Sequence, residues 1–119
     1  YETTAQTFFR TSNKECEVAG FTIPENSKVV CMLASANRDP RKWVNPNKYD
    51  INRRPSGHAA FGSGIHGCVG QAVARLEGEL ILSAIAKRVK RIEVIGDHTR
   101  RLNNTLRALD TLPLRLIPV

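Results

Sequence analysis

The feature that most constrains the fold of this chain is a glycine-rich segment at residues 61–70, which reads FGSGIHGCVG. Glycine permits positive φ angles and lets a backbone come close to a ligand. The segment delivers one cysteine, Cys68, to the first turn of a predicted long helix. Unpaired N–H groups and the positive end of the helix dipole meet there and favour a thiolate. Such a thiolate can be a nucleophile, a metal ligand or a haem ligand.

The same segment also satisfies the dinucleotide fingerprint G-x-G-x-x-G, at Gly62, Gly64 and Gly67. That fingerprint requires a buried strand directly before it, so that the pyrophosphate meets the start of the helix. Residues 53–60 read RRPSGHAA and do not predict a core strand. The missing strand makes a dinucleotide site a weak hypothesis.

Zinc and nucleophilic chemistry are two further alternatives for Cys68. A structural zinc site normally shows two close ligand pairs, whereas His66 and Cys68 form only one, with His58 and Cys31 as more distant candidates. A cysteine nucleophile could pair with a histidine, but no nearby residue stands out as the orienting third group. A purely structural cysteine in a glycine turn would need neither Phe61 nor His66 at these spacings.

Composition limits the class of protein. A chain of 119 residues with 41% hydrophobic residues can form one small domain. The net charge of +7 suits nucleic acid or an acidic protein, but the basic residues do not cluster with aromatic ones, which argues against nucleic acid. Three widely spaced cysteines argue against a disulfide framework and favour a reducing compartment such as the cytoplasm. No apolar run is long enough for a membrane helix.

Short strands are predicted before the loop. Residues 3–10 combine β-branched and aromatic side chains and predict a strand ending in a buried Arg10. Three more strands are expected around turns, at residues 16–18, 21–23 and 28–33. Cys31, in the last of them, is expected to be a small buried side chain. One helical turn at 34–37 and a long irregular segment up to residue 58 follow, and a loop this long indicates a function or a missing partner.

A helix and two more strands are predicted after the loop. Apolar residues recur at helical spacing for about five turns, at Val69, Ala72, Val73, Leu76, Leu80, Ala84 and Ile85. One face of this helix is expected to be core, with Glu77 and Glu79 in solvent. Residues 91–95 and 114–117 alternate like strands, and residues 97–112 are polar and basic with a turn signal at Asn103. The predicted fold class is therefore α+β.

The order F-G-x-G-x-H-x-C-x-G in residues 61–70, continued by ARLE at 74–77, resembles the haem-binding loop of the bacterial soluble cytochrome P-450 family. The segment NRDP at 37–40 ahead of Trp43, and YDINR at 49–53, resemble the family's meander. The resemblance implies that residues 1–119 are the C-terminal haem-binding portion of that fold. This portion has small β-sheets, the meander, the cysteine loop, one long helix and a C-terminal hairpin, and it lacks the upstream helices.

The resemblance also implies roles for residues of the loop. Cys68 would be the thiolate ligand of haem b (iron protoporphyrin IX), with Phe61 packed beside its sulfur. Gly62 and Gly64 would let the loop turn under the ring, and Gly70 would avoid a Cβ close to the porphyrin. His66 and Arg10 would each reach a haem propionate, a task that suits the two-pronged guanidinium.

Outside the loop, the resemblance implies substrate-lining residues at Gln6, Phe8, Leu106 and Arg107. It also makes Arg53 the arginine that pairs with a Glu-x-x-Arg helix. That helix is not in this sequence, so Arg53 is expected to lack its partners, which is costly for a buried cation.

As a family member, the parent protein would be a monooxygenase that inserts one oxygen atom of O₂ into an organic substrate. Within the family, its sequence most resembles those of cytoplasmic bacterial enzymes that oxidise para-substituted benzoic acids. A ferredoxin or flavin reductase would supply electrons, and basic residues such as Lys42, Arg54 and Arg75 could attract an acidic ferredoxin.

The oxygen-activating helix of the family is not in this sequence, so no catalytic residue is assigned. The chain alone is expected to turn over nothing, to expose apolar surface and to associate with itself. Two alternatives to the enzyme remain, a non-catalytic haem or redox-sensing module and a fragment that binds no haem.

Overall fold

The computed structural model describes residues 3–119, and the chain divides into two compact units rather than the single small domain that its length allows. The first unit runs through Ala60 and includes Asn103–Arg107. The second comprises Phe61–Leu102 and Ala108–Val119. The glycine-rich loop therefore opens the second unit.

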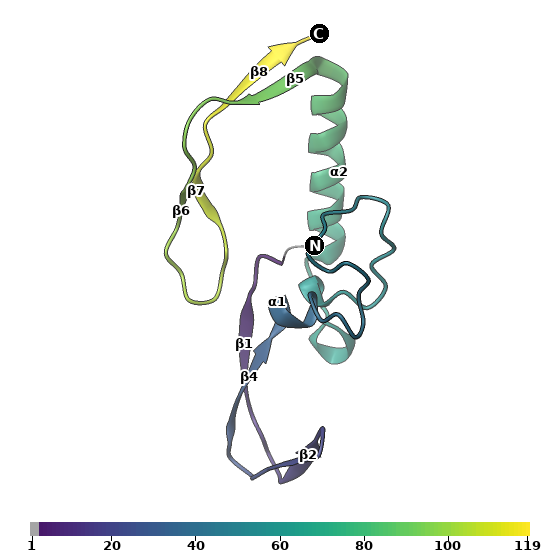
Figure 1. Ribbon diagram of the computed structural model, residues 1–119, viewed down its shortest axis with the longest axis vertical. Helices are drawn as coiled ribbons and strands as arrows, with labels where there is room; N and C mark the ends of the chain where they lie inside the picture. The colour runs from purple at the N-terminus through teal and green to yellow at the C-terminus, as the bar shows by residue number, and fades with distance from the viewer. Residues whose placement is uncertain (1–2) are drawn as a thin grey trace. The chain divides into compact units, whose positions relative to one another are not determined.

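The first unit contains two antiparallel strand pairs, built from the four strands that the sequence predicts. Strand β1 (Thr7–Thr11) pairs with β4 (Lys28–Met32), and Figure 1 shows the two side by side. Strand β2 (Cys16–Val18) pairs with β3 (Phe21–Ile23). Ala19 and Gly20, between them, have φ angles of 51° and 82°. Two consecutive positive φ angles are typical of the type I′ turn, whose twist matches that of the strands.

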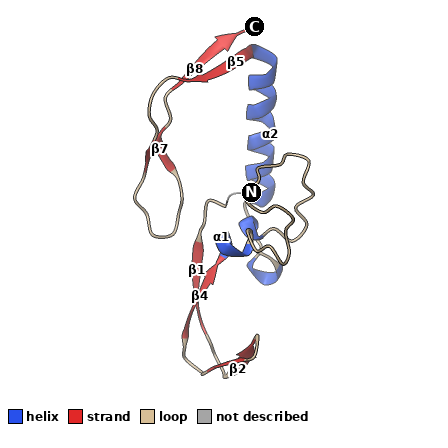
Figure 2. Cartoon of the chain, viewed as in Figure 1, coloured by secondary structure: helices blue, strands red, loops and turns tan. Residues whose placement is uncertain are grey.

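Helix α1 (Leu33–Ala36) is the predicted helical turn, and it leads into the long irregular segment. This segment appears as loop in Figure 2 and contains turns but no strand between residues 37 and 58. A 3₁₀ turn at Ala59–Phe61 then leads into the glycine-rich loop. The absence of a strand at residues 53–60 agrees with the weakness of the dinucleotide hypothesis.

Helix α2 (Gln71–Arg88) dominates the second unit and runs directly into strand β5 (Val89–Val94), as Figure 1 shows. Strand β5 pairs with β8 (Leu114–Pro118). The polar stretch 97–112 contains a further short ladder, β6 (Thr99–Arg100) with β7 (Leu109–Thr111), which its composition did not predict.

Burial is sparse. Among the described residues Trp43 is the buried hydrophobic side chain, at 7% exposure. The prediction that one face of the long helix is core is wrong for this chain, because α2 buries none of its residues. Val73, Leu76 and Leu80 are 59%, 56% and 61% exposed. The predicted exposure of apolar surface is thereby confirmed. Cys31 is half-buried, and Glu77 and Glu79 are exposed as predicted.

No helix in the described part of the chain combines the length and apolar character required to cross a membrane.

Candidate cofactor site

The glycine-rich loop is closed by a backbone hydrogen bond between its two ends. The N–H of Cys68 donates to the carbonyl oxygen of Phe61 at 2.8 Å. Inside the loop, a 3₁₀ turn at Gly64–His66 is completed by the N–H of Gly67, which donates to the Gly64 carbonyl at 3.0 Å. These bonds fix the place of Cys68 with respect to Phe61.

Two glycines make this closure possible. Gly62 and Gly64 have φ angles of +68° and +56°, a region in which side chains are strained. A Cβ on Gly62 would also collide with the carbonyl oxygen of His66, whereas a Cβ on Gly64 would meet open space. Gly62 is therefore required both for its conformation and for the close approach of the loop to itself.

The sequence predicted that Cys68 lies in the first turn of the helix. In the structure it precedes the helix. Helix α2 begins at Gln71, whose N–H donates to the Cys68 carbonyl at 3.2 Å. Val69 and Gly70, which lie between Cys68 and the helix, form a turn. Gly70 is the N-cap of α2 and has a non-helical conformation. A Cβ on Gly70 would lie 3.9 Å from the Cys68 sulfur, so Gly70 borders the thiol directly.

The chemistry of this site is that of a single exposed sulfur. Cys68 is an exposed, unbridged thiol. The described residues hold no group of three or more His, Cys, Asp or Glu side chains placed to bind a metal ion. A lone exposed thiol on a closed loop fits a cofactor that takes one protein ligand and brings the rest of its coordination with it.

Arg75 makes a contact with Phe61 that the sequence did not reveal. Its guanidinium carbon lies 5.3 Å from the centroid of the Phe61 ring, within the range of cation–π attraction. The ring is half-buried, and Arg75 is exposed. The fourteen positions that separate the two residues along the chain explain why no local sequence pattern predicts the contact.

Arg10, in the first unit, was expected to be buried, and this prediction is wrong. The side chain is exposed, donates from Nη1 to the Phe9 carbonyl at 2.8 Å, and lies 5.9 Å from the centroid of the Phe8 ring. The reason is that β1 belongs to a two-stranded sheet, which has too few strands to cover both of its faces.

Arg53 was expected to lack the partners that a Glu-x-x-Arg helix would supply, and the structure gives it backbone acceptors. Its Nη2 donates to the carbonyl oxygens of Asn45 and Lys48, at 2.8 and 3.0 Å. Backbone carbonyls of the irregular segment itself therefore accept hydrogen bonds from Arg53, in place of the Glu-x-x-Arg helix that the resemblance implies as its partner.

The structure brings three of the four predicted substrate-lining residues into one neighbourhood. Ala5 and Leu106 form an antiparallel bridge. On either side of it, the N–H of Gln6 donates to the Thr105 carbonyl at 2.7 Å, and that of Arg107 to the Thr4 carbonyl at 2.8 Å. Phe8 lies further along on β1 and is 44% exposed.

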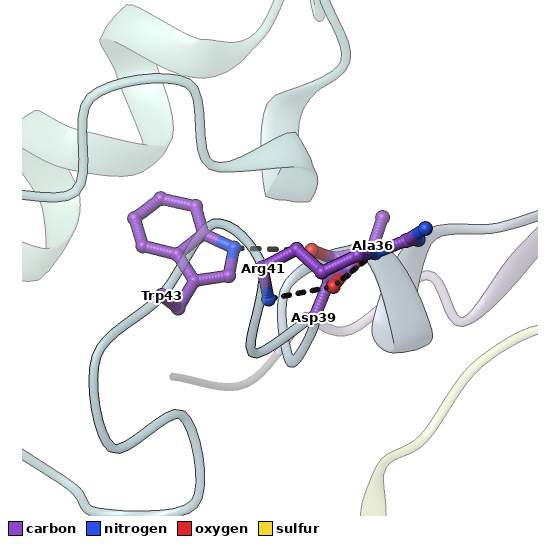
Figure 3. A network of polar contacts seen from close by, with 4 residues as sticks. All are labelled: Ala36, Asp39, Arg41 and Trp43. Carbon is purple, nitrogen blue, oxygen red and sulfur yellow. Dashed lines mark hydrogen bonds and ion pairs between the residues drawn. The ribbon is translucent and has the colours of Figure 1, made fainter.

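A polar network around Trp43 holds the irregular segment in place, as Figure 3 shows. The indole N–H donates to the Ala36 carbonyl at 3.0 Å, which ties the segment to the end of α1. Arg41 forms a salt bridge with Asp39 at 2.6 Å. Hydrogen bonds from the Arg41 side chain and backbone lower the pKa of Asp39 to about 2.

The approach to the cysteine loop is held by Asn37 and His58, whose roles the sequence did not indicate. The N–H of Ala59 donates to the Asn37 side-chain oxygen at 2.7 Å. The His58 ring meets the Trp43 ring edge-on, with 6.1 Å between centroids. Partial burial lowers the pKa of His58. The NRDP signal could have directed attention to Asn37, its first residue.

Comparison with known proteins decides the family. The sequence model of the cytochrome P-450 family matches residues 1–108. The chain belongs to the cytochrome P-450 family.

Relatives and solved structures agree with this assignment. Cytochrome P-450 CYP199A2 of Rhodopseudomonas palustris is 57% identical over 118 residues, which are 99% of this chain and 29% of that protein. The 6-deoxyerythronolide B hydroxylase of Saccharopolyspora erythraea is 38% identical over 114 residues, or 93% of this chain and 28% of that protein. The structure of cytochrome P-450 CYP109Q5 from Chondromyces apiculatus superposes with a TM-score of 0.91 at 37% identity, covering 100% of this chain and 31% of that one.

These relatives support the α+β class and the cytochrome P-450 type of fold. The chain spans less than a third of the length of each of the three proteins. In general, membership of the family implies haem held by a cysteine thiolate. Of the three thiols in this chain, Cys68 is the one on the closed glycine loop.

Proposed function

We propose that Cys68 would hold haem b through its thiolate, and that residues 1–119 are the C-terminal haem-binding portion of a monooxygenase. The observation that carries the proposal is the hydrogen bond from Cys68 N–H to the Phe61 carbonyl. It closes the loop and presents one exposed sulfur. The whole enzyme inserts one oxygen atom of O₂ into an organic substrate.

The residues of the loop hold the Cys68 sulfur where it can bind haem iron. Haem bound through a thiolate supplies the oxygen chemistry, because the thiolate donates electron density that favours O–O cleavage. Gly62 and Gly64 give the loop its sharp course, and Gly70 leaves the space beside the sulfur narrow but open. Because the Cys68 N–H is used by Phe61, its backbone is held while the sulfur is left for the iron.

His66 and Arg10 are the residues we assign to the haem propionates. His66 ends the 3₁₀ turn just before Cys68, so it is held by the same closed loop. Arg10 is exposed and carries a guanidinium that can grip a carboxylate with two hydrogen bonds. With haem bound, Phe61 would shield the sulfur from water, which would tune the reduction potential of the iron.

An aromatic carboxylic acid, such as a para-substituted benzoic acid, is the substrate class we propose. The support is the sequence likeness described above together with the bridge between Ala5 and Leu106, which gathers Gln6, Leu106 and Arg107. A guanidinium at Arg107 would favour a substrate carboxylate by charge. Phe8 supplies an aromatic face on the neighbouring strand.

The electron donor we propose is an acidic ferredoxin or a flavin reductase. The charge of +7 on the chain supports attraction of an acidic partner, and Lys42, Arg54 and Arg75 are the cations we assign to it. We propose the cytoplasm as the compartment of the parent enzyme, and the support is that the three cysteines of the chain are free thiols, as a reducing compartment would keep them.

The chain on its own is proposed to be inactive, since it spans 29% of the length of its relative CYP199A2. Its exposed α2 face favours self-association.

The experiment compares the chain, and a longer protein that carries it, in a reduced ferredoxin system with a para-substituted benzoic acid under isotopically labelled O₂. The longer protein should release product with one labelled oxygen, its Cys68→Ser variant should release none, and the chain alone should release none. Labelled product from the chain would contradict the proposed inactivity, and product from Cys68→Ser would contradict the ligand assignment.

A further inference from the structure

We propose that Arg75 is a positioning residue of the cysteine loop, acting through the ring of Phe61. Where it concerns haem, this inference rests on the proposed role of Cys68 as ligand. The contact itself does not, because all three residues lie in the second unit of the chain and meet without any cofactor.

The guanidinium of Arg75 lies over the ring of Phe61. Arg75 lies in α2, and its guanidinium carbon is 5.3 Å from the centroid of the Phe61 ring. A cation within about 6 Å of an aromatic centroid is attracted by the negative face of the ring. A fixed ring therefore holds the cation, and a fixed cation equally holds the ring.

Arg75 also has a hydrogen-bond partner, Gln71, on its own helix. With its amide oxygen turned toward Arg75, Gln71 accepts hydrogen bonds from Nε at 3.1 Å and from Nη2 at 3.3 Å. Residues four apart on a helix face each other, so this pair belongs to the surface of α2. The guanidinium is consequently held by Gln71 of its own helix while its central carbon lies over the Phe61 ring.

Phe61 is in turn hydrogen-bonded to Cys68. The Phe61 carbonyl accepts the Cys68 N–H at 2.8 Å, so the same residue that contacts Arg75 also holds the backbone of Cys68. Phe61 is thus attached to Cys68 through its backbone and to α2 through its ring. Removing the ring contact leaves Phe61 attached to Cys68 through its backbone alone, without a side-chain contact to the helix.

The test measures the closure of the loop directly, as amide hydrogen exchange of Cys68 in the 119-residue chain by NMR. The Leu80 amide, inside α2, serves as the reference for helix stability. Arg75→Gln should raise the exchange rate of Cys68 about two- to fivefold, the factor expected from an exposed cation–π pair, and leave Leu80 unchanged. Arg75→Lys keeps a cation over the ring and should restore most of the protection.

Two further variants separate the ring contact from a loss of surface charge. Arg88→Gln removes a cation from the last turn of the same helix and should leave Cys68 exchange unchanged. In a Phe61→Leu background, Arg75→Gln should have no additional effect, because the ring on which it acts is gone.

The proposal is overturned by an equal effect of Arg75→Gln with and without the Phe61 ring, or by no effect at all. It is also overturned if the Cys68 amide is unprotected in the unchanged chain. Exchange requires no haem, so the haem-ligand assignment can fail while this inference holds, and the reverse is equally distinguishable.

Discussion

The carbonyl oxygen of His66 occupies the place that a Cβ on Gly62 would need. The two residues belong to one closed loop, whose ends are joined by the hydrogen bond between Cys68 and Phe61. Space and backbone conformation therefore both select glycine at position 62.

We predict that Gly62→Ala destabilises the loop more than Gly64→Ala. Both positions have positive φ, which costs a side chain about 1–2 kcal/mol, but only Gly62 adds a backbone collision. Gly78→Ala is the matched control, because it lies in α2 in open space and should gain up to about 1 kcal/mol from helix propensity. Urea unfolding followed by circular dichroism measures the series. Equal losses for Gly62→Ala and Gly64→Ala would refute the collision.

Trp43→Phe should lower the free energy of unfolding by about 1 kcal/mol. The substitution keeps an aromatic ring in the buried site but removes the indole N–H that donates to the Ala36 carbonyl, which then lacks this donor. Val44→Ala, at a neighbouring side chain that is 84% exposed, should change stability by less than about 0.5 kcal/mol. If the two variants prove equally stable, the indole bond contributes nothing.

The Asp39 carboxylate should titrate at about pH 2 in the folded chain, against an ordinary value of 3.8. A lowered folded pKa means that the stabilisation is present above about pH 4 and is lost as the pH falls toward 2. Arg41→Gln removes the side-chain hydrogen bond and should bring the pKa back toward 3.8. NMR titration of the carboxyl carbon measures both values. An Asp39 that titrates near 3.8 with Arg41 intact would show that the pair does not form.

Local sequence patterns predicted most of the secondary structure. The strands around Gly20 and β4 follow from alternating apolar residues and turn residues, and α2 follows from its helical spacing. These signals lie within a few neighbouring residues, so one sequence carries them. The start of α2 is the exception, because Gly70 at the N-cap delays the helix to Gln71.

Burial could not be predicted in the same way. The apolar stripe of α2 indicates a core-facing helix, yet Leu76 and Leu80 are more than half exposed in this chain. A stripe shows that a helix has an apolar face, but not which segment covers it. Arg53 illustrates the same limit for a polar group, since its acceptors are backbone carbonyls of Asn45 and Lys48, which carry no side-chain signal.

The candidate site was predictable where its residues are close in sequence. The loop motif marks Cys68 and the glycines that shape its surroundings, and the structure closes that loop as a unit. The contact between Phe61 and Arg75 spans the loop and a turn of helix, and only the folded chain reveals it.

The central claim is that Cys68 binds haem iron as a thiolate, and the carbon-monoxide spectrum of the reduced, haem-loaded chain tests it most directly. We predict a strongly red-shifted Soret band that Cys68→Ser abolishes, whereas Cys16→Ser, at an exposed thiol outside the loop, leaves it unchanged. An ordinary haem band in the unchanged chain, a band that survives Cys68→Ser, or no band at all would contradict the claim.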